Sequence, residues 1–217
     1  MSRFLTQSAE FMPILLMGVK LTILVTIGSL GVATVLGLIW ALMRVCGIRA
    51  LAAISRTIVN IIRGIPIIVQ LFYIYFVLPD FGITLSALQA AIIGLGIAYS
   101  AYQAENFRAG IEAIDHGQVE AAQSIGMGWP LMMRRVILPQ AVRIVLPPYG
   151  NTMIMMLKDS SQASTITVAE LALQGKLIAS ATFQNSTVFT LVALLYLTMS
   201  IPLILLVGSL EKRFGRK

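Results

Sequence analysis

Long apolar runs separated by short polar segments set the pattern of this chain. The first run, Leu21–Met43, contains no charged residue and is long enough to cross a hydrocarbon core, which requires about 20 residues of helix. Because lipid cannot satisfy open backbone groups, each such run is predicted to be helical. The same reasoning predicts four further spans, over Thr57–Leu78, Phe81–Ala104, Pro148–Val168 and Thr187–Val207. The expected fold class is therefore an all-α integral membrane protein with five transmembrane helices.

Composition agrees with a membrane protein of one domain. Of the 217 residues, 58% are hydrophobic and 12% are charged, whereas a soluble protein carries about 25% charged residues. The net charge of +7 is spread between the apolar runs, so nucleic acid is not expected as a partner. Cys46 is the only cysteine, which excludes an internal disulfide and argues against a metal cluster.

Arginine and lysine are unevenly distributed between the two ends of the predicted spans. Cytoplasmic segments of membrane proteins are enriched in these residues. One side carries Arg44, Arg49, Arg56, Arg108, Arg134, Arg135, Arg143, Lys212, Arg213, Arg216 and Lys217. The other side carries Arg3, Lys20 and Lys176. This asymmetry agrees with an odd number of spans, and it predicts a periplasmic N-terminus and a cytoplasmic C-terminus.

A polar, helix-breaking segment lies between the third and fourth predicted spans. Asp115 suits the start of a helix, with Gln118 three residues later as in a capping box. Gly126 suits a left-handed helix stop, and Pro130 fits the first position of a second helix. Pro139 is expected to end that second helix or to bend it. The segment is thus predicted to hold two short helices joined by a glycine elbow.

The first of these short helices has the features of a docking element. Ala121 and Ala122 are small enough to let the helix enter a cleft of a partner protein, and Glu120 can pair with a partner arginine. An amphipathic loop that lies on the membrane surface would show similar patterning. Spacing alone does not separate these two interpretations.

The same segment resembles the EAA loop of bacterial ABC-importer permeases, in which EAA is followed by Gly and then by Ile-x-Leu-Pro. The matching residues are Glu120, Ala121, Ala122, Gly126, Val136, Leu138 and Pro139, with Val136 in place of the usual Ile. Three further stretches are similar to the polar amino acid uptake (histidine/glutamine/arginine-type) branch of that family. They are Arg63–Phe72, with Ile65 in place of Thr; Ala104–Ile111; and Lys158–Ser161, followed by Gln162 in place of Leu.

This resemblance implies the type I ABC-importer fold, with five transmembrane helices per subunit. It implies a permease domain at residues 15–210, a cytoplasmic coupling loop at 115–139 within it, and short tails at 1–12 and 211–217. The residues implied in coupling to an ATPase are Glu120, Ala121, Ala122, Gly126 and Pro139. The function implied is movement of a polar or charged L-amino acid across the bacterial inner membrane by alternating access.

The resemblance also implies the partners of the chain. These are a second permease subunit (the same chain or a sister chain), two ATP-binding subunits, and a periplasmic or surface amino-acid-binding protein. ATP and Mg²⁺ would lie on the ATP-binding subunits, and this chain is expected to bind no cofactor of its own. Membrane lipid would surround it.

The residues themselves suggest no catalytic centre. No Gly-x4-Gly-Lys-Ser/Thr motif occurs, so the chain has no recognisable phosphate-binding loop. His116, the only histidine, has no positioned nucleophile nearby in the sequence and is expected to be solvated or to take part in docking. A non-enzymatic transport subunit is therefore predicted. The alternatives are a self-sufficient secondary transporter or channel, which would transport without an ATPase, and an intramembrane hydrolase.

Lys158 and Asp159 fall within the fourth predicted span, where charge is costly and usually functional or paired. One interpretation is that the two residues neutralise each other or anchor a helix break. The other is that Asp159 faces a central cavity and holds the amino group of a substrate. The further candidate contacts along the substrate pathway are Ser160, Ser161, Gln70, Tyr102 and Lys158.

Packing is the simpler interpretation for two other groups of residues. Glu105 and Arg108, three residues apart, are predicted to form an ion pair. Small residues let helices approach closely in a membrane, either within a subunit or at a dimer seam. The glycines with this potential are Gly28, Gly31, Gly37, Gly94 and Gly96.

Overall fold

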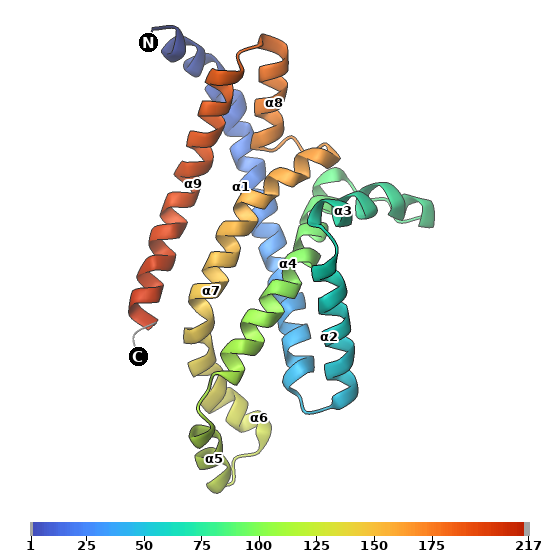
Figure 1. The fold of residues 1–217 in the computed structure, drawn as a ribbon, viewed down its shortest axis with the longest axis vertical. Helices are drawn as coiled ribbons and strands as arrows, with labels where there is room; N and C mark the ends of the chain where they lie inside the picture. The colour runs from blue at the N-terminus through green and yellow to red at the C-terminus, as the bar shows by residue number, and fades with distance from the viewer. Residues whose placement is uncertain (1, 215–217) are drawn as a thin grey trace.

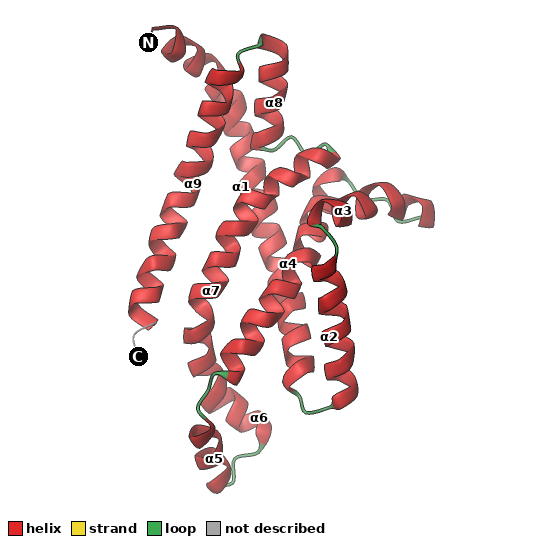
Figure 2. Cartoon of the chain, in the orientation of Figure 1, coloured by secondary structure: helices red, strands yellow, loops and turns green. Residues whose placement is uncertain are grey.

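The computed structural model describes the backbone of residues 2–214 and the side chains of residues 7–214. Every regular element within these residues is a helix (Figure 1, Figure 2). The α-helices are α1 (Ser2–Val45), α2 (Arg49–Gly64), α3 (Ile67–Phe72), α4 (Ala87–Glu112), α5 (His116–Ser124), α6 (Trp129–Met132), α7 (Leu138–Asp159), α8 (Leu171–Thr182) and α9 (Asn185–Phe214). Short π segments are Tyr73–Val77 and Met133–Ile137, and short 3₁₀ segments are Leu78–Phe81 and Ser160–Ile166. The predicted all-α class is confirmed.

Helix α1 runs along most of the molecule, and α4 packs against it over a long stretch (Figure 1). This close approach depends on glycine. A Cβ on Gly37 would lie 3.0 Å from the carbonyl oxygen of Ser100, and one on Gly96 would lie 2.5 Å from the Cβ of Val32. Packing within the subunit is therefore the role of these two glycines. A Cβ on Gly31, by contrast, would meet no atom within 4 Å.

Two helical stretches are each long and apolar enough to cross a membrane, Gln7–Val45 within α1 and Asn185–Phe214. The pair Arg49–Gly64 and Ile67–Phe81 passes the same test together, but its two parts are bent by 98° relative to each other. The prediction of one continuous span over Thr57–Leu78 is therefore wrong. The chain turns sharply in the middle of that range.

The turn lies at Ile65 and Pro66. Ile65 has an extended backbone, with φ −107° and ψ 129°, as a residue before proline prefers. The side-chain amide of Gln70 donates hydrogen bonds of 2.9 Å to the carbonyl oxygens of both Ile62 and Ile65. Gln70 thereby bonds to carbonyl groups at the C-terminal end of α2, where Ile62 also accepts a 3.4 Å hydrogen bond from the backbone N–H of Ile65.

Helix α4 starts later than the predicted third span, Phe81–Ala104. The hydroxyl of Ser86 accepts a hydrogen bond from the backbone N–H of Gln89, and the side chain of Gln89 accepts one from the backbone N–H of Ser86. This capping box fixes the first turn of α4. The helix then extends beyond the predicted end, to Glu112.

The fourth predicted span, Pro148–Val168, is displaced along the chain. Helix α7 is Leu138–Asp159, and the residues after it form a 3₁₀ segment. Pro139 does not end a helix, because the π segment Met133–Ile137 leads directly into α7 and places the proline in its first turn. The helical run is continuous through this point, and the π segment immediately before Pro139 marks where its hydrogen-bond pattern changes ahead of a residue that has no backbone N–H.

The C-terminal part of the chain forms two helices, α8 and α9. The predicted fifth span, Thr187–Val207, lies within α9, whereas α8 was not anticipated. Its sequence is as apolar as the start of α9, so hydropathy gives no boundary between them. The boundary is at Phe183, which adopts a left-handed conformation with φ +58° and ends α8.

A buried carboxylate joins α8 to α1 and α9. Glu170 is fully buried at the N-cap of α8 and accepts hydrogen bonds from the backbone N–H groups of Ala172 and Leu173, each at 2.9 Å. The hydroxyl of Tyr196 on α9 donates to the same carboxylate at 2.8 Å, and that of Thr22 on α1 donates at 3.4 Å. These donors offset the cost of burying the carboxylate.

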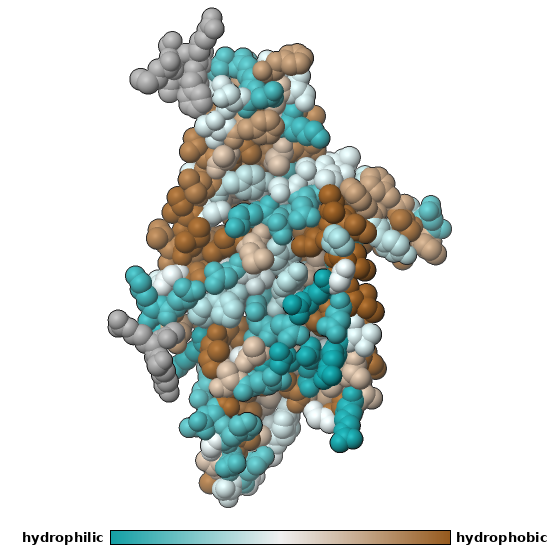
Figure 3. Space-filling view, in the orientation of Figure 1, coloured by the Kyte–Doolittle hydropathy of each residue, from teal (hydrophilic) through white to brown (hydrophobic). Residues whose placement is uncertain are grey.

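Hydrophobic and hydrophilic residues are segregated on the face drawn in Figure 3. Hydrophobic residues gather along α9 and along the opposite edge near α2 and α3, whereas hydrophilic residues cover much of the centre and the lower part. The apolar flanks suit contact with lipid, and polar groups inside a membrane face protein or water-filled cavities. The hydrophilic centre of this face lies over α4 and α7.

Candidate functional site

The loop at residues 115–139 folds into two short helices, α5 and α6, as the sequence predicts (Figure 1). Asp115 begins α5, since its carboxylate accepts a 2.6 Å hydrogen bond from the backbone N–H of Gly117. This bond takes the place of the capping box expected with Gln118. Gly126 has φ +76°, the left-handed conformation predicted for the end of the first helix. Pro130 lies in the first turn of α6, also as predicted.

The 115–139 loop has a hydrophobic cluster of its own. Ala122 is 4% exposed and packs in a cluster with Ile114, Met132 and Ile137. In this structure α5 therefore uses the Ala122 face to pack on the rest of the loop, and the role of Ala122 in coupling stays a prediction. The cluster gives the loop a fixed shape at the end of α4 and α7.

The opposite face of α5 is open to a partner. Glu120 and Ala121 are both exposed, and Ile125, at the end of the helix, is 73% exposed. Trp129, at the start of α6, is also exposed. An acidic residue, a small residue and two large apolar side chains of the loop are thus exposed. His116 is exposed as well, in agreement with the expectation that it is solvated or takes part in docking.

A second candidate site is centred on Asp159, at the C-terminal end of α7. The hydroxyl of Tyr99 on α4 donates a 2.7 Å hydrogen bond to the Asp159 carboxylate. Lys158 is exposed and forms no ion pair with Asp159 in the described part of the chain, where the ion pairs join Arg44, Arg108, Glu105 and Glu112. Mutual neutralisation of Lys158 and Asp159 is therefore not how this charge is accommodated.

Tyr102 and Arg63 extend this site toward α2. The rings of Tyr99 and Tyr102 have their centroids 5.7 Å apart, and the guanidinium carbon of Arg63 lies 5.7 Å from the Tyr102 centroid. A cation at this distance from an aromatic face is attracted by the ring quadrupole. Arg63, Tyr102, Tyr99 and Asp159 thus form a continuous chain of contacts across three helices. Its two ends are the carboxylate of Asp159 and the guanidinium of Arg63.

The remaining candidate contacts are placed differently. Ser160 is fully buried, and its hydroxyl donates to the carbonyl oxygen of Leu157 at 2.7 Å. Ser161 is half-buried, next to it in the chain. The amide of Gln70 is bonded to the carbonyl groups at the α2–α3 turn. In this conformation, Asp159 and Tyr102 therefore offer more accessible polar groups than Ser160 and Gln70 do.

Two members of the Asp159 site were missed from the sequence. Tyr99 lies three residues before Tyr102 and therefore on the same face of α4, a spacing that could have indicated it. The sequence predicts Arg63 near one end of its span, where its long stem could reach the membrane surface, and its contact with Tyr102 on α4 depends on how α2 packs before the turn at its end. Hydropathy gives no sign of that turn.

Helices α1 and α4 are joined by ion pairs near one end of the bundle. The carboxylate of Glu105 lies 2.7 Å from Arg44 on α1 and 2.7 Å from Arg108 on its own helix. Arg108 also pairs with Glu112. The predicted pair of Glu105 with Arg108 is confirmed, and the contact with Arg44 turns it into a link between two helices.

Comparison with known proteins identifies the family of the chain. Residues 33–216 match the family described as the binding-protein-dependent transport system inner membrane component. The chain is 37% identical over 206 residues to the probable amino-acid ABC transporter permease protein YckA of Bacillus subtilis (strain 168), covering 95% of this chain and 91% of that protein. It is 39% identical over 195 residues to the probable glutamine ABC transporter permease protein GlnM of the same organism, covering 90% of each.

A solved structure shares the fold over nearly the whole chain. It is a crystal structure described as an amino acid ABC transporter with histidines, and it matches with a TM-score of 0.89 at 37% identity, covering 97% of this chain and 98% of that one. The sequence match and the fold match thus agree and extend over both candidate sites. The chain belongs to the family of binding-protein-dependent transport system inner membrane components and is a permease of the ABC-transporter type.

Proposed function

We propose that this chain is the transmembrane permease subunit of an ATP-driven importer in a bacterial inner membrane, and that it moves a polar or charged L-amino acid by alternating access. The observation that carries the proposal is the family match over residues 33–216, together with relatives named as permeases for amino acids, glutamine and L-cystine. These names include different amino acids, which supports amino acids as the substrate class. Experiment must identify the amino acid that this chain transports.

The proposed topology has five spans, formed by α1, the bent α2–α3 pair, α4, α7 and α9. The stretches Gln7–Val45 and Asn185–Phe214 satisfy the length and hydropathy of a span by themselves. Helices α4 and α7 are more polar than α1 and α9, as suits helices that also line a polar pathway. The excess of arginine and lysine on one side supports a periplasmic N-terminus, with the 115–139 loop and the C-terminus in the cytoplasm.

Coupling to ATP hydrolysis is assigned to the 115–139 loop. Two separate ATP-binding subunits would hold ATP and Mg²⁺, and α5 would lie in a groove of one of them through Glu120, Ala121 and Ile125. The packed core of the loop supports this role, since a rigid loop transmits a push to α4 and α7 whereas a flexible one absorbs it. Gly126 and Pro139 act on the shape of the loop, at its elbow and at its junction with α7.

The remaining parts of the proposed assembly lie outside this chain. A second permease subunit, either another copy or a sister chain, would pair with it and enclose the substrate pathway. A periplasmic or surface amino-acid-binding protein would deliver the substrate. The permease itself catalyses no reaction and needs no cofactor, because ATP binding on the partners drives the change between its two states. Such a change requires the nucleotide to bind one state more tightly than the other.

Substrate contact is assigned to the chain of residues that ends at Asp159. A carboxylate can hold the α-amino group of an amino acid, and Asp159 provides this group. Arg63 borders the same pathway beyond the rings of Tyr99 and Tyr102. Lys158 is adjacent to Asp159 in the chain and Ser161 follows two residues after it, and both complete the proposed pathway.

A transport assay with a panel of substrates tests this function. The permease would be reconstituted into liposomes with its ATP-binding subunits and binding protein, and labelled glutamine, arginine, histidine, cystine and a sugar would be offered separately. ATP-dependent accumulation of at least one polar amino acid, and none of the sugar, is expected. Accumulation of the sugar alone, or of no amino acid in an assembly that hydrolyses ATP, would refute the substrate class.

A further inference from the structure

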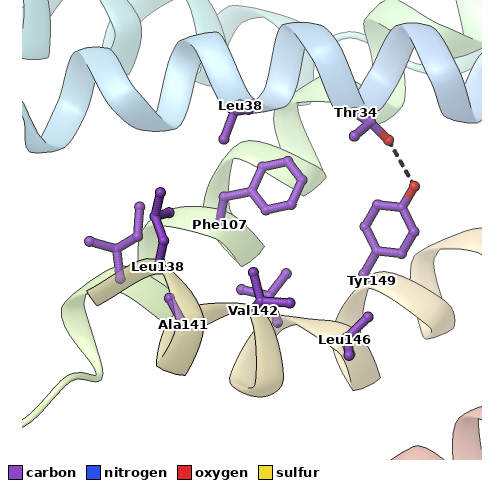
Figure 4. Close-up of a pocket in the computed structure, with 10 residues that line it drawn as sticks. Thr34, Leu38, Phe107, Leu138, Ala141, Val142, Leu146 and Tyr149 are labelled. Carbon is purple, nitrogen blue, oxygen red and sulfur yellow. Dashed lines mark hydrogen bonds between the residues drawn. The ribbon is translucent and has the colours of Figure 1, made fainter. Parts of the chain in front are cut away.

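An open groove of about 340 Å³ lies between α1, α4 and α7, on the part of α7 that follows the 115–139 loop (Figure 4). Its walls are mainly carbon, with Leu38 on α1, Phe107 on α4, and Val142 and Leu146 on α7. Val142 is 53% exposed and Leu38 is 40% exposed, so the groove opens onto the surface of the helices. A groove of this kind suits an elongated apolar ligand.

The polar atoms of the groove are already satisfied. The hydroxyl of Thr34 donates to the carbonyl oxygen of Leu30 at 2.6 Å, which leaves its oxygen free to accept from the hydroxyl of Tyr149 at 2.8 Å (Figure 4). The ring of Tyr149 packs against that of Phe107, with centroids 6.3 Å apart and ring planes inclined by 30°, and both rings line the groove. Neither hydroxyl needs a polar ligand, so methylene groups are the best match to this lining.

Two arginines lie immediately before the groove in the chain. Arg134 and Arg135 are both exposed and belong to the π segment that leads into α7, one helical turn before the lining residue Leu138. Neither takes part in the ion pairs found among the described residues. By contrast, Arg44 and Arg108 are neutralised by Glu105 and Glu112. Arg134 and Arg135 thus carry positive charge without an ion-pair partner at the loop end of the groove, and the exposed Arg143 does so farther along α7.

We propose that this groove and these two arginines bind one anionic phospholipid of the inner leaflet. An acyl chain lies along α1, α4 and α7, and the phosphate is held by Arg134 and Arg135. A guanidinium group can donate two parallel hydrogen bonds to the oxygens of one phosphate. Each basic residue beside a membrane raises the affinity for anionic lipid by about five-fold. The proposal rests on the proposed topology, which places this end of α7 at the cytoplasmic side.

The consequence concerns the 115–139 loop, to which the two arginines belong. Arg134 and Arg135 lie between α6 and α7, so a lipid bound to them fixes the base of the 115–139 loop at the level of the headgroups. The lipid would thereby act as part of the lever between α5 and the membrane helices. A lipid without a net negative charge could place its acyl chain in the groove, but its headgroup would bind Arg134 and Arg135 less tightly.

Native mass spectrometry of the assembled transporter tests the proposal. The probes are phosphatidylglycerol and phosphatidylcholine with identical acyl chains, and inorganic phosphate. The wild-type assembly is expected to retain phosphatidylglycerol on the order of ten-fold more strongly than phosphatidylcholine. The double variant Arg134→Gln/Arg135→Gln should lose this preference. The matched double variant Arg49→Gln/Arg56→Gln, which removes two exposed arginines from α2, should keep it. Equal retention of both lipids by the wild type, or the same loss in the α2 variant, would overturn the proposal.

Further experiments distinguish acyl-chain binding in the groove from headgroup binding by the arginines, and lipid from other ligands of the groove. Val142→Trp should fill the groove and lower retention of phosphatidylglycerol, with folding checked by circular dichroism, and unchanged retention would refute the acyl-chain site. Displacement of the lipid by millimolar inorganic phosphate would assign the arginines to free phosphate. Disulfide cross-linking between two Val142→Cys chains, in a Cys46→Ser background, would show that a second copy covers the groove. Both of these results contradict the proposal, whereas loss of amino acid uptake alone bears only on the proposed function.

Discussion

The hydroxyl of Tyr99 on α4 lies 2.7 Å from the carboxylate of Asp159 and donates a hydrogen bond to it. This bond joins α4 to the point where α7 gives way to a 3₁₀ segment. Asp159 is therefore held in place by a neutral donor, and its charge is not cancelled by the lysine beside it. A carboxylate positioned in this way is suited to bind a positively charged group of a ligand.

Replacement of Asp159 tests its assignment to substrate binding. Asp159→Ala is expected to lower uptake by about ten-fold or more, since a hydrogen bond to a charged group contributes about 1.5–3 kcal/mol. ATP binding by the partner subunits should persist, because Asp159 lies far along α7 from the loop. Tyr99→Phe keeps the carboxylate and removes one donor, so its effect should be smaller. Unchanged uptake in Asp159→Ala would remove this residue from the site.

The elbow of the 115–139 loop offers a matched pair of glycines. Gly126 has φ +76°, whereas Gly128 has φ −67° and open space around its Cβ position. Gly126→Val should cost about 1–2 kcal/mol in the loop and reduce co-purification of the ATP-binding subunits. Gly128→Ala should leave co-purification and uptake unchanged. A normal assembly with Gly126→Val would contradict the role of the elbow.

Charge on the exposed face of α5 gives a separate test of docking. Glu120→Lys reverses an exposed charge without disturbing the buried cluster around Ala122, so the permease should fold normally. ATP-driven uptake should fall, together with stimulation of the ATPase by substrate. The measurement is ATPase activity in the reconstituted assembly with and without substrate. Full coupling in this variant would place the contact elsewhere.

The buried carboxylate of Glu170 is predicted to govern the stability of the helical bundle. Glu170→Ala leaves two backbone N–H groups and the Tyr196 hydroxyl without their acceptor, which should destabilise the protein by about 3 kcal/mol or more. Tyr196→Phe removes one donor and should cost about 1 kcal/mol. Thermal unfolding in detergent gives both values. Equal melting temperatures for Glu170→Ala and the wild type would refute this role.

Close packing of α1 on α4 can be tested with two glycines of the same helix. Gly37→Leu should force the helices apart at Ser100 and cost about 1–3 kcal/mol of stability. Gly31→Ala should have little effect on the isolated subunit, since its Cβ meets no atom within 4 Å. A loss of permease pairing in Gly31→Ala, measured by size-exclusion chromatography, would instead place this glycine at the dimer seam.

Local chemistry made much of the loop predictable from the sequence. Asp115 and Pro130 start helices and Gly126 ends one for reasons that involve only neighbouring residues. The orientation of Ala122 was not predictable in this way, because it depends on a cluster that includes Met132 and Ile137 from the second half of the loop. A local pattern predicts where a helix begins, but the face it buries depends on what packs against it.

The same distinction applies to the membrane helices. The apolar run that becomes α1 was evident, but hydropathy did not separate α8 from α9 or reveal the turn at Pro66. Asp159 was found because charge is rare in an apolar segment. Tyr99, its hydrogen-bond partner, lies 60 positions away in the sequence and is an ordinary residue for a membrane helix. Contacts such as the Tyr99–Asp159 hydrogen bond depend on how the helices pack, so they can be identified only from the three-dimensional structure.

The central claim is that energy enters this permease from a separate ATPase through the 115–139 loop. The most direct measurement is amino acid uptake by liposomes that contain the permease and binding protein, either with or without the ATP-binding subunits. Accumulation is expected when those subunits are present and Mg-ATP is supplied on the side of the loop. Accumulation by liposomes that lack the ATP-binding subunits would contradict the claim.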